Sequence, residues 1–281
     1  ALAAHFHVIA PDWLGFGESA KLFSFDDMRG LRVHHIALVL KALGIGQAHF
    51  IGNSMGGGML AAVAAQPKPA WNIAKMILVG AGGFAPVNEA RKILNSYDGS
   101  REHMKRVLET VLTYTPLRFD EAYLDKRHHL SLIPGSWECT AAARFRRPGV
   151  KAGEKEDTDY RAIARPTLIV AGGKDPLREP GFAPKLQQEI AGSELAVFEE
   201  AGHFPHIDMP ERFNQIAIDF LSRWTGLPYP WPHMTSVEGD QIIGGGAAFL
   251  AGRGLARSWK PFWRVYVYIA LLAAAHSRTP K

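Results

Sequence analysis

The sequence predicts an α/β fold in which a mostly parallel sheet is flanked by helices. Short apolar segments, most of them followed by glycine or proline turns, alternate with segments of helical periodicity along most of the chain. Strands that alternate with helices are typical of a parallel sheet with both faces covered. The 281 residues, 47% of them hydrophobic, are enough to bury the core of one large domain, with or without an appendage.

The first predicted strand, residues 5–10, leads through a turn-rich stretch into a helix. Asp26 and Asp27 are candidate caps for this helix, and its apolar residues recur at helical spacing up to a glycine stop at Gly44. Neither an initiator methionine nor a basic leader region precedes the strand. We therefore expect no signal peptide and a chain that begins in the middle of a βα unit.

The stretch GNSMG, residues 52–56, stands between a predicted strand, residues 48–51, and a predicted helix of small residues, 55–65. The spacing G-x-S-x-G is the pattern of a nucleophile elbow, in which glycines let strand and helix pack closely around a strained serine. The Met55 backbone N–H and the positive end of the helix dipole would face negative charge that develops at Ser54. We predict Ser54 as a nucleophile and Met55 as an oxyanion donor; the alternative is an ordinary turn.

A third predicted strand, residues 75–79, is followed by a long stretch with helical periodicity and no strand pattern. We interpret residues 86–158 as a helical cap, or lid, with a charged surface loop that returns to the sheet. The core is expected to comprise residues 1–85 and 159–225, and residues 226–281 form a linker and an apolar and basic tail. The predicted cap helices are residues 89–96, 101–114 and 120–132.

Two more predicted strands, residues 166–171 and 195–198, complete the sheet, with a helix at 182–190 between them. The last predicted helix is the clearest, because apolar residues recur at helical spacing over 213–224. Asp208 and Glu211, around Pro210, are expected to mark its start.

Three residues follow the carboxyl ends of predicted strands: Ser54, Asp175 and His203. Parallel sheets gather their sites at that edge. A serine needs a base to take its proton, histidine titrates near neutral pH, and a carboxylate orients the imidazole. We predict a Ser-His-Asp triad; taken singly, Asp175 could cap a turn and His203 could be a surface residue. Asp12 or Asp208 is the alternative acid if it lies nearer the imidazole.

The chain resembles the α/β-hydrolase superfamily over about residues 1–224. The resemblance is carried by VIAPDWLGFGES, GNSMGG, GGKDPLREP and GHFPHIDMPERF. Asn53, the strand end LVGAGG and the cap are similar to the meta-cleavage product hydrolases, which split a carbon–carbon bond in ring-opened dienoates from aromatic degradation. That resemblance implies Asn53 as a substrate-binding residue and makes Arg127, in the cap segment Asp-Lys-Arg, a candidate carboxylate clamp. The other interpretation of Arg127 is a solvated helix residue.

The chain departs from that family in two places. Phe204 stands where those hydrolases often have a tryptophan, and phenylalanine there is common among esterase-like members, so we expect Phe204 to line the substrate site. The family's first strands, and the loop with its second oxyanion N–H, would lie upstream of Ala1. The resemblance therefore implies an N-terminally incomplete hydrolase of a small carboxylic ester, a thioester or a ring-fission dienoate. The rival is a degenerate protein that binds an acyl ligand without catalysis.

In the family's sheet order, a strand missing from this sequence would lie between the strands that contain Val8 and Phe50. We therefore expect either a gap between these two strands or their direct pairing. Orphaned backbone groups cost about 1–3 kcal/mol each. Such a chain should express poorly and turn over slowly.

The tail and the charge pattern exclude some partners. Residues 227–232 are a stiff linker, and the apolar segments 242–251 and 265–275 are too short for a membrane span. Contact of the tail with a membrane surface is less favoured than a loosely packed extension. The residues that give the net charge of +5 are scattered along the chain, so we expect no nucleic-acid partner. We expect a small-molecule substrate, and the sequence is compatible with a homo-oligomer.

The chain has one cysteine, Cys139, which excludes an internal disulfide and a multi-cysteine metal site. We interpret it as a packing residue, and it fits a reducing compartment, so we expect a cytoplasmic protein. Serine nucleophile chemistry needs no metal ion, and no cofactor or metal is expected.

Overall fold

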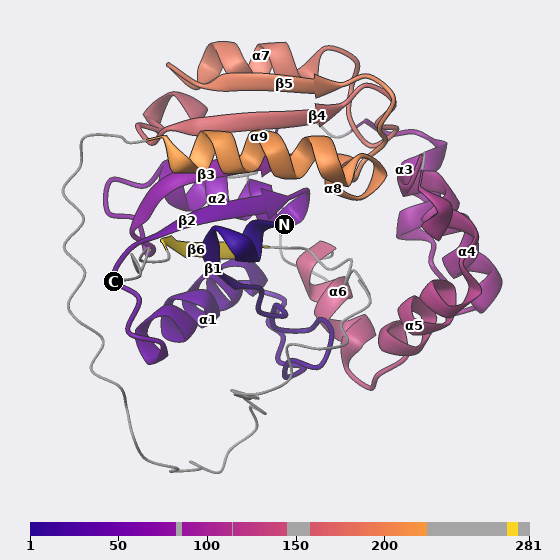
Figure 1. Ribbon diagram of the computed structural model, residues 1–281. Coiled ribbons are helices and arrows are strands. Elements are labelled where there is room, and N and C mark those ends of the chain that lie inside the picture. The colour runs from indigo at the N-terminus through magenta and orange to yellow at the C-terminus, as the bar shows by residue number, and fades with distance from the viewer. Residues whose placement is uncertain (83–85, 114, 145–157, 224–268, 275–281) are drawn as a thin grey trace, which may run out of the picture.

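The structure is a computed structural model that describes residues 1–82, 86–113, 115–144, 158–223 and 269–274. Within these ranges, one sheet has the strand order β1-β6-β2-β3-β4-β5 (Figure 1). Its strands are β1 Phe6–Ile9, β2 Ala48–Asn53, β3 Ile73–Val79, β4 Thr167–Gly172, β5 Glu194–Phe198 and β6 Ile269–Ala274.

Helices alternate with the strands as predicted, and β2 to β5 pair in parallel, so the mostly parallel α/β fold is confirmed. Helix α1, Met28–Ala42, is capped by Asp27, whose carboxylate accepts a hydrogen bond from the Gly30 N–H at 2.7 Å. The other helices are α2 Met55–Ala64, α3 Glu89–Asn95, α4 Arg101–Val111, α5 Glu121–Ser131, α6 Ser136–Arg144, α7 Phe182–Glu189, α8 Pro205–Asp208 and α9 Pro210–Ser222.

Two apolar clusters cover opposite faces of the sheet because successive strand residues point to opposite sides. Met76 and Leu78 of β3 pack in a cluster with residues of α1, α2 and α7. Ile77 and Val79 of the same strand pack in the other cluster, with α9. Figure 1 shows α9 lying across one face of the strands. This two-sided burial holds the carboxyl ends of the parallel strands at one edge.

Strand β6 lies between β1 and β2 and runs antiparallel to both (Figure 1). Val8 pairs with Leu272, and Phe50 pairs with Leu271. The predicted gap or direct pairing at this place is therefore wrong, and residues 269–274 are a strand of the sheet rather than a loose extension. The physical reason is that unpaired N–H and C=O groups on two strand edges can be satisfied by a strand of either direction.

Helices α3 to α6 lie between β3 and β4 in the chain and stand beyond the carboxyl ends of the parallel strands (Figure 1). Leu108 of α4 and Leu124 of α5 are buried in one cluster that also contains Leu177 and Ile207, which follow β4 and β5. These helices thus pack on the two loops that carry Asp175 and His203.

Helix α6 contacts the start of α1 through a smaller cluster. Cys139 is fully buried there, with Leu14, Met28 and Ala142. The thiol is a free cysteine, and its Sγ donates to the Leu22 carbonyl at 3.4 Å. The prediction that Cys139 is a packing residue is confirmed.

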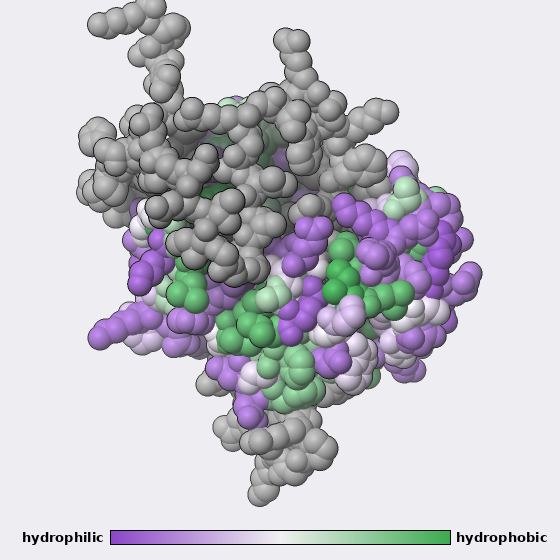
Figure 2. All heavy atoms as spheres, turned by 90° about the horizontal axis from the view of Figure 1, so that it is seen from below, coloured by the Kyte–Doolittle hydropathy of each residue, from purple (hydrophilic) through white to green (hydrophobic). Residues whose placement is uncertain are grey.

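Apolar side chains gather in patches between hydrophilic ones on the face seen from below in Figure 2. Large apolar side chains that are more than half exposed include Leu22, Leu132 and Trp137. No helix in the part of the chain that the structure describes has the length and apolarity that crossing a bilayer requires. The predicted linker 227–232 and apolar segment 242–251 lie outside the described residues, as do most of the predicted return loop and the end of the last predicted helix at Trp224.

Candidate active site

Ser54 occupies a strained turn between β2 and α2. Its φ of 49° and ψ of −113° make it the only non-glycine residue with positive φ among the residues that the structure describes. The Ser54 N–H donates to the Val79 carbonyl at 2.8 Å. A Cβ on Gly52 would lie 2.7 Å from the Gly57 backbone, so the two elements touch through glycines. The strained turn and the close strand–helix packing of a nucleophile elbow are confirmed.

The start of α2 offers donors next to this serine. The first backbone N–H groups of a helix have no intrahelical acceptor, and they carry the positive end of the helix dipole. Met55 is the first residue of α2, and no side chain caps the helix. Its N–H is therefore available to a developing oxyanion, and Met55 as that donor stays a prediction.

His203 and Asp175 form a buried hydrogen-bonded pair. The distance between His203 Nδ1 and Asp175 Oδ2 is 2.8 Å, and the two side chains are 3% and 1% exposed. The other carboxylate oxygen of Asp175 accepts the Leu177 N–H at 2.8 Å. The carboxylate thus orients the imidazole, which leaves Nε2 for another partner.

Two further contacts bring this pair next to the elbow. The Asn53 side-chain amide donates to the Val79 carbonyl at 3.0 Å and to the His203 carbonyl at 3.3 Å. A Cβ on Gly80 would lie 3.3 Å from His203 Nδ1. The Val79 carbonyl also accepts the Ser54 N–H, so this carbonyl and the Asn53 amide together connect the serine to the histidine loop. Asn53 is only 2% exposed and links three segments, while its role toward substrate stays a prediction.

Asp208 holds the loop in front of the histidine and is not the acid of the pair. Its carboxylate accepts the Gly202 N–H at 2.8 Å and the Thr113 N–H at 3.1 Å. Asp208 is the last residue of α8, and α9 begins at Pro210 without a side-chain cap. The last helix therefore begins at Pro210 as predicted, with Glu211 in its first turn, but Asp208 does not cap it, because its carboxylate serves backbone groups of two other segments.

The alternative acid Asp12 also lies elsewhere. Asp12 accepts the Glu18 N–H at 3.1 Å and so closes its own turn. Of the three candidate acids, Asp175 is the one whose carboxylate bonds the His203 imidazole.

The two other predicted substrate residues occupy different places. The Phe204 ring centroid lies 5.2 Å from that of His203, and Phe204 packs against the cluster under α4 and α5. Arg127 lies on α5 and is partly buried. Its substrate contact stays a prediction.

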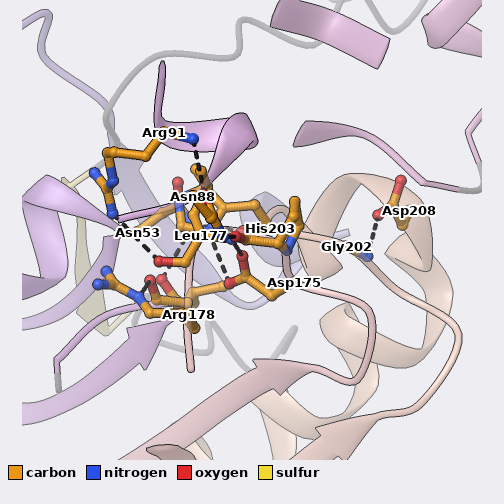
Figure 3. A network of polar contacts seen from close by, with 12 residues as sticks. Asn53, Asn88, Arg91, Asp175, Leu177, Arg178, Gly202, His203 and Asp208 are labelled. Carbon is orange, nitrogen blue, oxygen red and sulfur yellow. Dashed lines mark hydrogen bonds and ion pairs between the residues drawn. The ribbon is translucent and has the colours of Figure 1, made fainter. Parts of the chain in front are cut away.

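Three polar residues of this region had no role in the sequence reasoning. Asn88, the N-cap of α3, donates to the Pro176 carbonyl at 2.7 Å. Arg91 Nη2 donates to the Leu177 carbonyl at 3.2 Å, and Arg178 Nε donates to the Gly80 carbonyl at 2.8 Å (Figure 3). Arg178 stands three residues after the predicted acid Asp175, and this proximity in sequence could have marked it as a site residue. Nothing in the sequence connects Arg178 with Arg91, which lies in another part of the chain.

His206 is a buried histidine behind the pair. Burial lowers the pKa of His206 to about 3, and the positive charge of a protonated His203 acts in the same direction. Its ring centroid lies 5.8 Å from Phe204 and 5.7 Å from Phe213. His206 is therefore a neutral packing residue at ordinary pH. Within the described part of the chain, no group of three His, Cys, Asp or Glu side chains could hold a metal ion.

Comparison with known proteins decides the family. Residues 1–216 match the alpha/beta hydrolase family. The chain belongs to this family. The 2-hydroxymuconate semialdehyde hydrolase of Pseudomonas putida is 33% identical over 219 residues, 76% of this chain and 76% of its own. The 2-hydroxy-6-oxononadienedioate/2-hydroxy-6-oxononatrienedioate hydrolase of Klebsiella pneumoniae is 29% identical and covers 78% of each chain.

Solved structures agree with the sequence relatives. A meta-cleavage product hydrolase from Pseudomonas fluorescens superposes with a TM-score of 0.62 at 27% identity, over 75% of this chain and 78% of that chain. The resemblance to meta-cleavage product hydrolases is confirmed, and this member of the alpha/beta hydrolase family is a hydrolase. Residues 233–278 match a second family, described as a domain of unknown function, DUF6867, and β6 lies within that match.

Proposed function

We propose that this hydrolase cleaves a carbon–carbon bond of a ring-fission dienoate through Ser54, His203 and Asp175. The observation that carries the proposal is the 2.8 Å hydrogen bond between His203 and Asp175 beside the strained turn of Ser54. A serine on such a turn, next to an oriented imidazole, is the arrangement that activates a hydroxyl as a nucleophile.

In the proposed reaction, Ser54 is the nucleophile, His203 acts in turn as base and acid, and Asp175 orients the imidazole. His203 Nε2 takes the hydroxyl proton as Ser54 Oγ adds to the substrate ketone carbon. The Met55 N–H faces the oxyanion that forms on the ketone oxygen. The dienol reacts in its keto form, in which the carbon next to the ketone already carries the extra proton. When the carbon–carbon bond breaks, its electron pair is delocalised through the adjacent double bond onto the 2-oxo oxygen, which takes the proton from His203 and becomes the dienol hydroxyl of the second product. Water, deprotonated by His203, releases the acyl group from Ser54 as a carboxylic acid.

The substrate class is inferred from the relatives. By their names, they act on 2-hydroxymuconate semialdehyde or on 2-hydroxy-6-oxo dienoates, which are conjugated acids with a ketone or aldehyde. We assign the dienoate carboxylate to Arg127 as its clamp, with Phe204 and Asn53 lining the site. A carboxylic ester is the alternative substrate, and both proposals use the same serine. A cytoplasmic location stays a prediction.

Paired assays with a ring-fission dienoate and with p-nitrophenyl esters test the proposal. We expect the dienoate to be consumed faster, with loss of its visible absorbance, and Ser54→Ala to lower kcat by about 10⁴-fold or more. Ser96→Ala, an exposed serine at the end of α3, is the matched control and should leave kcat unchanged. Ester turnover without dienoate cleavage would remove the carbon–carbon assignment, and activity that survives Ser54→Ala would remove the serine mechanism.

A further inference from the structure

Two arginines lie beside the His203–Asp175 pair and have no part in the proposed reaction. Arg91 comes from α3, and Arg178 comes from the loop after β4. Figure 3 shows their guanidinium groups on the same side of this loop. Each donates one hydrogen bond to a backbone carbonyl, Arg91 to Leu177 and Arg178 to Gly80. Residues far apart in the sequence thus place two cations together.

Most N–H donors of the two guanidinium groups have no hydrogen-bond acceptor among the described residues. A guanidinium has five N–H donors in a planar fork that suits carboxylates. The Arg91 Nε is buried and donates to no atom in the described residues. In the described residues, Arg178 donates hydrogen bonds only through its Nε. The ion pairs that join described residues include neither arginine.

The charges around the two groups favour an anion. Burial lowers the pKa of Arg178, and the nearby Arg91 charge acts in the same direction, while Asp175 and Tyr160 raise it. Asp175 is already bonded to His203 and to a backbone N–H. The Asp175 carboxylate offsets part of the repulsion between the two partly buried cations, and a bound anion would offset more of it.

A purely structural role explains only part of this arrangement. Holding the Leu177 and Gly80 carbonyls needs one donor from each side chain, and a neutral amide could supply it. The Arg178 guanidinium also lies over the Phe182 ring, 5.8 Å from its centroid, which accounts for one cation. These contacts do not account for a second cation, and they leave the buried Arg91 Nε without an acceptor.

The position of the pair relative to the nucleophile indicates which part of a substrate would reach it. Arg178 binds the Gly80 carbonyl, and the carbonyl before it, that of Val79, accepts the Ser54 N–H. The acyl group of the substrate becomes bonded to Ser54 in the proposed reaction. A carboxylate at the end of that acyl group would therefore lie near the two arginines, while Arg127 belongs to α5.

We propose that Arg91 and Arg178 form a second anion-binding subsite that takes a carboxylate at the end of the acyl group, so that the preferred dienoate is a dianion. This inference rests on the proposed function. It makes the acid released from the acyl group a dicarboxylic acid such as succinate, and it makes charge at the acyl end the property that this enzyme selects.

Steady-state kinetics with two ring-fission dienoates test the subsite. One substrate carries an acyl group that ends in a carboxylate, and the other carries an acyl group of the same length that ends in a methyl group. We expect the wild type to favour the carboxylate substrate in kcat/KM, and Arg178→Met and Arg91→Met each to lower this ratio by about tenfold or more. Arg212→Met is the matched control, because Arg212 belongs to α9 and its guanidinium lies over the Phe198 ring. The substrate ratio of this variant should equal that of the wild type.

The ratio separates a subsite from a general loss of structure. A misfolded variant lowers kcat/KM for both substrates by the same factor. If Arg91→Met and Arg178→Met each lower kcat/KM equally for the two substrates, the inference is overturned. A wild type that treats the two substrates alike would do the same.

Binding measurements keep the inference testable if the proposed function fails. Calorimetry would compare succinate with butyrate on the wild type and on the two variants. Tighter binding of succinate, lost in Arg178→Met, supports the subsite even if neither dienoate is cleaved. Equal binding of the two acids to the wild type would contradict the subsite.

Discussion

The carboxylate of Asp208 accepts a hydrogen bond from the Gly202 N–H at 2.8 Å and thereby anchors the residue that precedes His203. The same carboxylate binds the Thr113 N–H beyond α4, and the His203 N–H donates to the Val111 carbonyl at 3.1 Å. The backbone at His203 is therefore held by segments from both sides of the site, and we expect Asp208 to act as a positioning residue for the imidazole.

Removing this anchor should slow the reaction without removing any reacting group. We expect Asp208→Ala to lower kcat by roughly 10- to 100-fold, because small misplacements of a reacting group carry such costs. Asp208→Asn retains one acceptor oxygen and should recover part of the loss. KM should change much less than kcat in both variants. An unchanged kcat in Asp208→Ala would contradict the positioning role, and Asp219→Ala, on α9, is the control.

The close contact of β2 and α2 predicts a strong effect at Gly57. A Cβ there would lie 2.3 Å from the Ala81 Cβ and 2.6 Å from the Gly52 carbonyl oxygen. Gly57→Ala should lower the free energy of unfolding by about 1–3 kcal/mol and reduce kcat by displacing Ser54. Gly58→Ala is the matched control, since a Cβ there has no atom within 4 Å; a helical alanine should leave stability unchanged or raise it by up to about 1 kcal/mol. Denaturant unfolding of both variants tests this, and equal stabilities would refute it.

Arg32 of α1 contacts α2, the helix that follows Ser54, and α6, and its side chain is buried, with 1% exposure. Its guanidinium donates to the Leu14 and Cys139 carbonyls, both at 3.2 Å, and burial lowers the Arg32 pKa to about 10. Arg32→Met leaves two buried carbonyls without this donor, at about 1–3 kcal/mol each, so we expect a large fall in the thermal unfolding midpoint. Arg29→Met, an exposed position on the same helix, should shift the midpoint by only a degree or two.

The buried His206 predicts a pH dependence of stability. Its folded pKa of about 3 lies below the ordinary value of 6.5, so the unfolded chain binds more protons between these two pH values. Stability should therefore be full above pH 6.5 and fall as the pH drops toward 3, by up to about 1.4 kcal/mol per pH unit from this residue.

His206→Phe removes this contribution, so its unfolding free energy should decline less steeply with falling pH. Burial also lowers the pKa of His35 and lowers that of His49 to about 4, and these residues keep a remaining slope in both proteins. Replacing the exposed His129 by Gln controls for loss of a histidine. Parallel pH profiles for wild type and His206→Phe would refute the prediction.

Strand β6 predicts that the tail contributes to folding. Its backbone pairs with β1 on one side and β2 on the other. Ending the chain at residue 223 would leave the facing edges of β1 and β2 unpaired. Each buried backbone group without a partner costs about 1–3 kcal/mol, so several of them together rival a typical domain stability of about 5–15 kcal/mol. We expect that shortened chain to be largely insoluble, whereas removal of residues 275–281 alone should leave solubility unchanged. Equal solubility and unfolding midpoints for the two would contradict a structural role of β6.

Local sequence patterns specify the features that depend on neighbouring residues. The G-x-S-x-G spacing around Ser54 specifies a local turn, and the order of Ser54, Asp175 and His203 at strand ends brings them to one sheet edge because parallel strands share a direction. The hydrogen bond between Asp175 and His203 was therefore predictable, and so were strands β1 to β5 and the main helices around them.

Contacts between distant segments depend on the packing of the folded chain and could not be predicted from local patterns. No local pattern joins β6 to β1 and β2, since a strand edge accepts any segment that satisfies its backbone groups. Asp208 resembled a helix cap in sequence, yet its carboxylate reaches Gly202 and Thr113, because a nearby pair of buried N–H groups competes for it. Arg91 and Arg178 meet for the same kind of reason: packing of α3 on the loop after β4 brings two charges together that the linear order keeps apart.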